Sequence, residues 1–175
     1  MPVGKGGSRD IDVPEKAEIG IEGNVFITSD CQEGQYGEYG GYVGSGSSAQ
    51  PTFHVDVITY RDDPIWPMSI TGRPTDESHT LWAIGLAADA LTYLREAGLP
   101  VKAAWIPEDS TVHWLLIVMP ENWRELLPGM TSEALSQRIG EVLFKTSAMV
   151  FIPKVYVVDD DFDPTNLREV AWVLS

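Results

Sequence analysis

The stretch Pro74-Thr75-Asp76-Glu77-Ser78-His79-Thr80-Leu81 divides the chain into two parts with different patterns. Thr75 or Asp76 can cap a helix here, and acidic residues are favoured at the positive N-terminal end of a helix. Apolar residues then recur at helical spacing, and Gly98-Leu99-Pro100 is a stop signal. The stretch therefore predicts the start of a long helix. The residues expected on its apolar face are Leu81, Ile84, Ala88, Leu91 and Leu94.

Before this helix, the sequence reads as β structure. Ala17 to Glu22 and Phe53 to Tyr60 alternate apolar residues with polar or small ones, which is typical of strands. The region from Glu33 to Pro51 is rich in glycine and serine, so it predicts a loop with one or two short extended pieces. Arg61 to Arg73 contains two prolines and predicts a connector.

After the helix, strands and helices alternate, which favours a layered α/β domain. The expected strands are Lys102 to Ile106, His113 to Met119 and Val155 to Val158. A second long helix is expected from Thr131 to Ala148, with its apolar face formed by Leu135, Ile139, Val142 and Leu143. A last helix is expected to begin at Asp163-Pro164, with the proline at its first position.

Composition limits the possible partners. The chain has 175 residues, of which 43% are apolar, and 12 basic against 26 acidic side chains give a net charge of −14. Nucleic acid and anionic membrane surfaces both require clustered positive charge, so we expect neither as a partner. Cys31 is the only cysteine, which excludes an intrachain disulfide and a cysteine-rich zinc site. With no secretory signal or long apolar run, the sequence predicts a cytoplasmic protein.

Glu33 and Glu38 lie five residues apart in Glu33-Gly34-Gln35-Tyr36-Gly37-Glu38. Neither a strand nor a helix brings side chains at this spacing together, whereas a loop containing Gly34 and Gly37 can. Two carboxylates close to one ligand repel each other, so one of them keeps its proton and can act as a general acid. The alternative is a solvated turn in an acidic protein.

Three other features have weaker functional interpretations. Four aspartates between Asp159 and Asp163 suggest a metal site, but they fail the EF-hand spacing and fit a strand end followed by a helix cap better. Gly4 to Ser8 lacks the spacing of a phosphate loop and fits a flexible terminus. The three histidines share no metal-ligand spacing, although His79 can cap the helix or form a hydrogen bond near a pocket. We therefore expect no metal ligands in this chain.

Several stretches, in the same order along the chain, resemble the UbiD decarboxylase family. They are Ala17-Glu18-Ile19-Gly20-Ile21-Glu22-Gly23, Glu33 to Tyr42, Ile58 to Ser69, Gly72 to Thr80 and Val157 to Asp163. The family has Glu-Gly-Pro-Phe-Gly-Glu/Asp where this chain has Gln35 and Tyr36 in place of the proline and the phenylalanine. The wording Thr-Asp-Glu-Ser-His-Thr is similar to that of the ferulate and pyrrole-carboxylate type members. Several ordered motifs are more specific than any single one.

The resemblance implies a fold, a reaction and roles for five residues. Residues 1–73 would be the terminal part of a split β-barrel that binds the flavin, and residues 74–175 an incomplete α/β domain that drives oligomerisation. Glu38 would donate a proton to the carbon left after CO₂ departs, and Glu33 would belong to a Glu-Arg-Glu network. Tyr39, Ser78 and Trp82 would line the substrate pocket. The substrate would be an aromatic or α,β-unsaturated acid, and the protein a homo-oligomer.

The cofactor implied is prenylated FMN, accompanied in the family by manganese and potassium. The family's arginine and its Asn, His and Glu metal ligands match nothing in this chain. Since the chain opens directly into strand-like sequence and stops within a helix pattern, we expect a segment that is inactive alone. The alternative is a non-catalytic truncated or assembly subunit.

Overall fold

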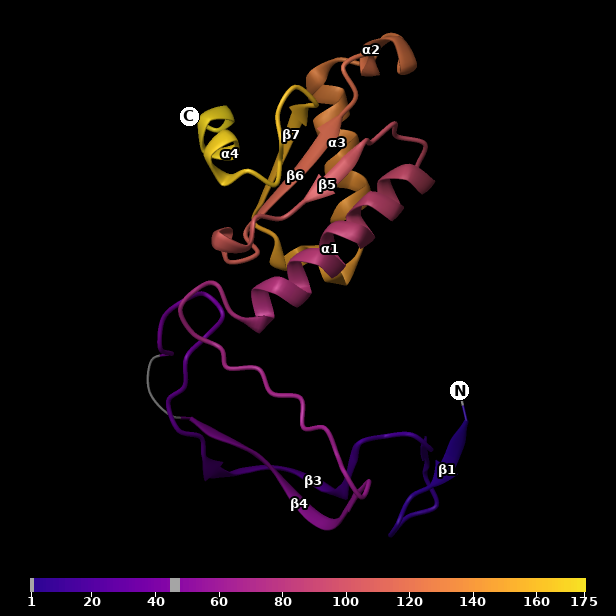
Figure 1. The fold of residues 1–175 in the computed structure, drawn as a ribbon, viewed down its shortest axis with the longest axis vertical. Helices are drawn as coiled ribbons and strands as arrows, with labels where there is room; N and C mark the ends of the chain where they lie inside the picture. The colour runs from indigo at the N-terminus through magenta and orange to yellow at the C-terminus, as the bar shows by residue number, and fades with distance from the viewer. Residues whose placement is uncertain (1, 45–47) are drawn as a thin grey trace. The chain divides into compact units, whose positions relative to one another are not determined.

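The computed structural model describes residues 2–44 and 48–175, which form two compact units. The first consists of Met1–Tyr36 and Val43–Ser69, and the second of Gly37–Tyr42 and Ile70–Ser175 (Figure 1). The short segment Gly37–Tyr42, which contains Glu38, thus belongs with the helical part of the chain rather than with the β structure on either side of it.

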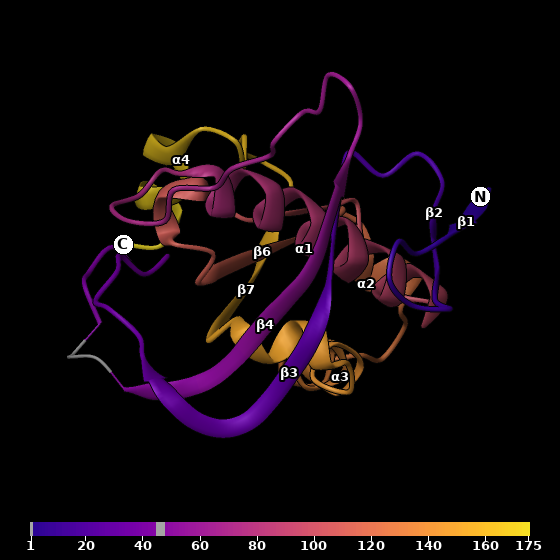
Figure 2. The same ribbon diagram turned by 90° about the horizontal axis from the view of Figure 1, so that it is seen from below.

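The first unit contains two antiparallel strand pairs. Strand β1 (Val3–Lys5) pairs with β2 (Asp12–Pro14), and the long β3 (Ile19–Gln32) pairs with β4 (Ala49–Tyr60) in the curved ribbon of Figure 2. Both strands predicted for this ribbon are confirmed, and both are longer than predicted. The Gly4–Ser8 region, predicted to be a flexible terminus, instead contributes β1.

A β-bulge interrupts the alternation predicted for β4. Glu22 is aligned with Val57, whereas Gly23 is aligned with Val55, so that Asp56 has no register partner. A Cβ atom at Gly23 would lie 2.0 Å from the carbonyl oxygen of His54, so only glycine fits there. Large apolar side chains of the ribbon, such as Val25, Ile27 and Val55, are exposed, which is expected of a two-stranded sheet.

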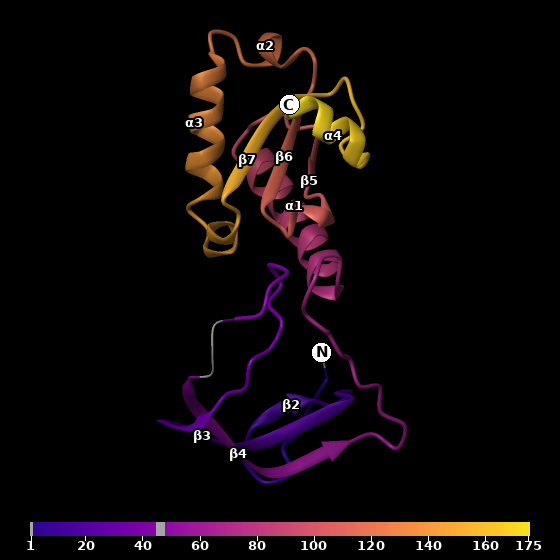
Figure 3. The same cartoon turned by 90° about the vertical axis from the view of Figure 1, so that its left-hand side faces the viewer.

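The second unit is built on a three-stranded sheet in the order β5-β6-β7. Strand β5 (Ala103–Trp105) is antiparallel to β6 (Trp114–Met119), which is parallel to β7 (Lys154–Asp159). A parallel pair requires a crossover connection. This one contains the short helix α2 (Trp123–Leu126), helix α3 (Ser132–Leu143) and the 3₁₀ helix η2 (Ser147–Phe151). Figure 3 shows α3 and the final helix α4 (Leu167–Val173) on opposite sides of the sheet.

One hydrophobic core joins β6, α3 and the long helix α1 (Glu77–Glu96). Alternate residues of β6 face it, as the two-residue period of a strand requires. The buried residues of these three elements in this core are Ala83, Ala87, Ala90, Leu94, Leu115, Ile117, Met119, Leu135, Ile139 and Leu143. The apolar face predicted for α3 is therefore confirmed, with Val142 at its edge.

The apolar face predicted for α1 is largely wrong. Leu81 and Ile84 are 71% and 61% exposed, and of the five predicted residues only Leu94 is fully buried. The buried face is instead a stripe of alanines, with His79 at its N-terminal end. Alanine on the inner face lets a helix approach a sheet closely, and the larger residues then remain outside. The sequence carries two overlapping apolar stripes, and size complementarity selects the smaller one.

The C-terminal helix begins later than predicted. Helix α4 starts at Leu167 and is capped by Asn166, whose side chain accepts a hydrogen bond from the Arg168 N–H at 3.2 Å. Asp163 instead caps a turn, in which its carboxylate accepts the Thr165 N–H at 2.9 Å. The placement of a proline at the first helical position is therefore wrong. The second predicted helix is also shorter than expected, because it ends at Leu143 and η2 follows.

Candidate functional site

Glu38 begins a tight turn that its neighbours close by backbone hydrogen bonds. The Glu38 N–H donates to the Tyr42 carbonyl, and the Gly41 N–H donates to the Glu38 carbonyl, both at 2.9 Å. Gly41 has φ +89°, a left-handed conformation that glycine adopts without strain. A Cβ at Gly37 would lie 2.7 Å from the Thr71 carbonyl oxygen, so a side chain is excluded there as well. The loop conformation predicted here is confirmed.

The start of α1 lies against this turn and is tightly capped. Asp76 is the N-cap: its Oδ1 accepts the Ser78 N–H at 2.8 Å, and its Oδ2 accepts the Gly72 N–H at 2.9 Å. Burial opposes ionisation of Asp76, but the two N–H groups and the nearby His79 outweigh it, and the pKa of this carboxyl is lowered. Of the two predicted caps, Thr75 and Asp76, the structure has Asp76, and its carboxylate is held in place by these hydrogen bonds.

Tyr39 lies between two aromatic side chains. Its ring centroid is 5.5 Å from that of Trp82, with the planes inclined by 60°, and 6.2 Å from that of His113, with the planes at 79°. These distances are typical of favourable aromatic pairs. The structure thus brings together two of the three predicted substrate-pocket residues. Ser78 lies in the first turn of the same helix and is half-buried.

Tyr39 and Trp82 line an apolar pocket of about 370 Å³. Its lining residues are Tyr39, Leu81, Trp82, Gly85, Leu86, Asp89, Val112, Ala148 and Phe151. Asp89 is the only charged residue among them. A pocket of this size, with apolar walls and few polar groups, is typical of sites for small planar ligands.

Three residues of this lining, Val112, Ala148 and Phe151, were not predicted from the sequence. No periodic pattern marks these residues, which come from segments well separated from Trp82 along the chain. One conformational signal is visible only in the structure: Thr111 and Val112 have φ values of 56° and 63°. Consecutive β-branched residues in this region are strained, and such strain is concentrated at functional sites. It turns Val112 inward, where its side chain is buried.

Glu33 is part of the first unit. Its side chain is exposed, and its backbone N–H donates to the Ser48 carbonyl at 3.0 Å. A Cβ at Gly34 would meet nothing within 4 Å, so no steric demand requires this glycine, in contrast to Gly37. Glu33 and Glu38 thus belong to different compact units of the chain.

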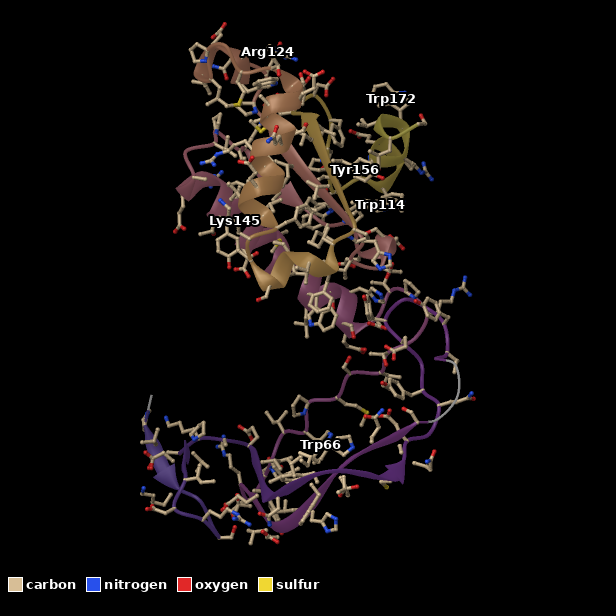
Figure 4. All side chains as sticks on the ribbon, turned by 180° about the vertical axis from the view of Figure 1, so that it is seen from behind. Trp66, Trp114, Arg124, Lys145, Tyr156 and Trp172 are labelled. Carbon is tan, nitrogen blue, oxygen red and sulfur yellow. The ribbon has the colours of Figure 1, made fainter. Side chains whose placement is uncertain are left out.

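A larger pocket of about 580 Å³ lies within the second unit but contains none of the predicted site residues. Arg124 and Trp172, labelled in Figure 4, are among the residues that line it. Trp114 and Tyr156, labelled in the same view, form an edge-to-face pair with their centroids 6.1 Å apart. The smaller pocket is the better candidate because two predicted site residues, Tyr39 and Trp82, line it.

Within ranges 2–44 and 48–175, no group of three or more His, Cys, Asp or Glu side chains is arranged to hold a metal ion. In the same residues, no helix combines the length and apolarity needed to cross a membrane.

Comparison with known proteins gives consistent matches along the chain. The 3-octaprenyl-4-hydroxybenzoate carboxy-lyase Rift-related domain matches residues 1–74, and the C-terminal domain of that carboxy-lyase matches residues 79–175. Pyrrole-2-carboxylic acid decarboxylase of Pseudomonas aeruginosa is 33% identical over 163 residues, which are 93% of this chain and 33% of that protein. Ferulic acid decarboxylase 1 of Saccharomyces cerevisiae is 33% identical over 173 residues, which are 98% of this chain and 34% of that protein.

Solved structures show the same fold. Vanillic acid decarboxylase of Sedimentibacter hydroxybenzoicus, in an open form, matches with a TM-score of 0.78 and 27% identity, covering 99% of this chain and 35% of that one. An evolved dimeric form of the UbiD-class enzyme HmfF of Pelotomaculum thermopropionicum, in complex with prFMN, matches with a TM-score of 0.76 and 24% identity, covering 98% and 37%. The chain spans about a third of the length of the curated relatives it matches. Because the two domain matches follow each other in sequence order and account for nearly all of its residues, the chain belongs to the UbiD family of carboxy-lyases.

Proposed function

We propose that this chain forms part of a non-oxidative decarboxylase that acts reversibly on an aromatic or α,β-unsaturated acid with prenylated FMN. The observation that carries the proposal is the turn at Glu38, which places the next residue, Tyr39, in the wall of an apolar pocket beside Trp82. Membership of the family supports it, as do two relatives named as decarboxylases of pyrrole-2-carboxylic and ferulic acid.

In this proposal, the residues of the chain bind the planar part of the substrate and deliver a proton. Tyr39 and Trp82 present aromatic surface to a flat acid, while Ser78 offers a hydroxyl at the start of α1. When the bond to the carboxyl carbon breaks, CO₂ leaves, and the electron pair of the broken bond stays on the substrate carbon. Protonated Glu38 then forms the new C–H bond and becomes a carboxylate, which regains a proton from solvent. Glu33 would assist from the same loop.

Three of the four cations described in the first unit are already paired with carboxylates and so do not fit the phosphate end of a flavin. Arg9 pairs with Asp56 and Arg61 pairs with Glu18, each at 2.7 Å, and Lys5 lies 2.8 and 2.9 Å from Asp10 and Asp12. Each of these positive charges already faces a carboxylate. We therefore propose that residues outside this sequence bind the phosphate end of the cofactor, together with its manganese and potassium ions. The cofactor would supply the electron sink when bound.

Two further parts of the proposal follow the division of the chain into two domain matches. Residues 1–73 would be part of a flavin-binding split barrel and residues 74–175 part of an α/β domain that assembles into a homo-oligomer. The exposed Ile84 of α1, outside the pocket lining, offers apolar surface for such an assembly. The isolated chain would be inactive, so that by itself it would resemble a non-catalytic assembly subunit.

The test uses the full-length protein that carries this segment, expressed with a flavin prenyltransferase. Glu38→Gln removes the acidic proton while keeping the shape, and we expect CO₂ release from an aromatic acid to fall by about 10²–10⁴-fold, the usual contribution of a general acid. Glu125→Gln, an exposed residue of α2, is the matched control and keeps full activity. Unchanged CO₂ release by Glu38→Gln would exclude this residue as the proton donor.

A further inference from the structure

His79 is a buried side chain whose two ring nitrogens contact different parts of the candidate site. Its exposure is 0%. Nε2 lies 2.6 Å from the carbonyl oxygen of Tyr39, and Nδ1 lies 3.0 Å from the backbone nitrogen of Asp76. The ring therefore bridges the Glu38–Tyr39 turn and the first turn of α1.

The partners determine where the ring protons lie. A carbonyl oxygen only accepts, so Nε2 carries a proton and donates it to Tyr39. The Asp76 N–H donates to Nδ1 as part of a capping box. Nδ1 also lies 2.9 Å from Asp76 Oδ1, which would accept a second ring proton. The hydrogen bond to Tyr39 is thus present in either charge state.

One helical turn consequently holds Tyr39 in two ways. His79 holds its backbone carbonyl, and Trp82, three residues further along α1, contacts its ring. Tyr39 directly follows Glu38 in the chain, and the backbone of Glu38 closes the turn by hydrogen bonds with Gly41 and Tyr42. A change in the position of His79 would therefore move the backbone that carries Glu38.

We propose that His79 is a positioning residue that fixes the Glu38–Tyr39 turn on the N-terminus of α1, and so aims the proton donor at the substrate. This role rests on the proposed function of Glu38. His79 touches neither substrate nor reacting atoms in this assignment, and it acts through the Tyr39 carbonyl. The capping of the helix is a separate role of the same ring, performed by the other nitrogen.

Two substitutions separate these roles. In His79→Asn, the amide oxygen can occupy the place of Nδ1 and accept the Asp76 N–H, but nothing reaches Tyr39. In His79→Gln, the longer side chain can place an amide N–H near the position of Nε2 and restore the bond to Tyr39. Both replacements are polar and can form hydrogen bonds in the buried site. Their melting temperatures, measured in parallel, show how much each substitution destabilises the fold.

We expect kcat of the full-length holoenzyme to fall by about 10–100-fold in His79→Asn, because small misplacements of a catalytic group are costly. KM changes less, since the walls of the pocket remain. The solvent deuterium isotope effect on kcat rises, because proton delivery becomes slower than the other steps. His79→Gln recovers part of kcat and lowers the isotope effect again. A purely structural role would move the melting temperature but not the isotope effect.

The outcomes distinguish this proposal from the one on which it rests. If His79→Asn folds and keeps the wild-type kcat and isotope effect while Glu38→Gln is inactive, the positioning role is wrong and the proton donor stands. If Glu38→Gln remains active, the proposed function itself fails. Nitrogen-15 chemical shifts provide a readout without activity: we expect a protonated Nε2, and a bare Nε2 would overturn the assignment.

Discussion

The rings of Tyr39 and Trp82 lie 5.5 Å apart at one wall of the apolar pocket, although one belongs to a glycine-rich turn and the other to a helix. This pair gives a direct prediction about ligand binding. Trp82→Ala should weaken the binding of a planar aromatic acid to the full-length protein by about 5-fold, since one aromatic contact contributes about 1 kcal/mol. Trp82→Phe should keep most of the affinity.

The control for this prediction is another exposed tryptophan. Trp172 is 70% exposed and does not line this pocket, whereas Trp82 is 50% exposed. Trp172→Ala should leave the affinity unchanged in the same titration, measured by calorimetry. Equal affinity in wild type and Trp82→Ala would show that aromatic acids bind elsewhere.

Because the alanine stripe of α1 is buried, substitutions on this face should be much more destabilising than substitutions on the exposed face. Ala90 is fully buried, so Ala90→Leu should lower the free energy of unfolding by about 1–3 kcal/mol through overpacking. Ile84→Ser, on the exposed face, should change it by only about 0.5 kcal/mol in either direction. Urea denaturation measures both changes. A larger loss of unfolding free energy in Ile84→Ser than in Ala90→Leu would show that the face predicted from the sequence is the buried one.

Gly85 lies inside α1 and Gly98 lies just after its end. Substitution by alanine should change the free energy of unfolding in opposite directions at these two positions. Gly98 has φ +80° and open space around it, so Gly98→Ala should destabilise the unit by about 1 kcal/mol through backbone strain alone. Gly85 lies inside the helix with equally open space, so Gly85→Ala should stabilise it by about 0.5–1 kcal/mol. Thermal unfolding tests the pair, and a shift of the same sign in both would contradict the assigned conformations.

The anchored carboxylate of Asp76 predicts a dependence of stability on pH. Its pKa is lowered from the ordinary value of 3.8, so its ionised form stabilises the fold above pH 3.8. That contribution is lost as the pH falls through the folded pKa. The stability advantage of wild type over Asp76→Asn should therefore shrink below about pH 3.8.

Acid titrations of unfolding, followed by circular dichroism, measure this difference. Asp161→Asn serves as the control because this aspartate is exposed on the opposite end of the sheet from the helix cap. A wild-type advantage that stays constant from neutral pH to about pH 2 would show that the Asp76 carboxylate is not the group responsible.

Local sequence signals predicted much of what is local in the structure. The cap at Asp76, the stop at Gly98 and the connector from Arg61 were readable, because each depends on the backbone preferences of a few adjacent residues. The face of α1 could not be predicted, since two apolar stripes share Leu94 and only packing in the core, against β5 and α3, chooses between them. The first residue of α4 was also missed, because Asp163 and Asn166 both offer good caps.

By itself, the sequence determined the family, the order of the elements and the Glu38–Tyr39 turn, since these depend on ordered motifs and on glycines that only certain backbone conformations require. Only the tertiary structure decided which residues meet: Val112 and Phe151 in the lining of the pocket, and the hydrogen bond from His79 to the Tyr39 carbonyl. Such contacts join segments far apart along the chain, and they are set by the packing of α1 on its sheet, for which no local pattern carries the information.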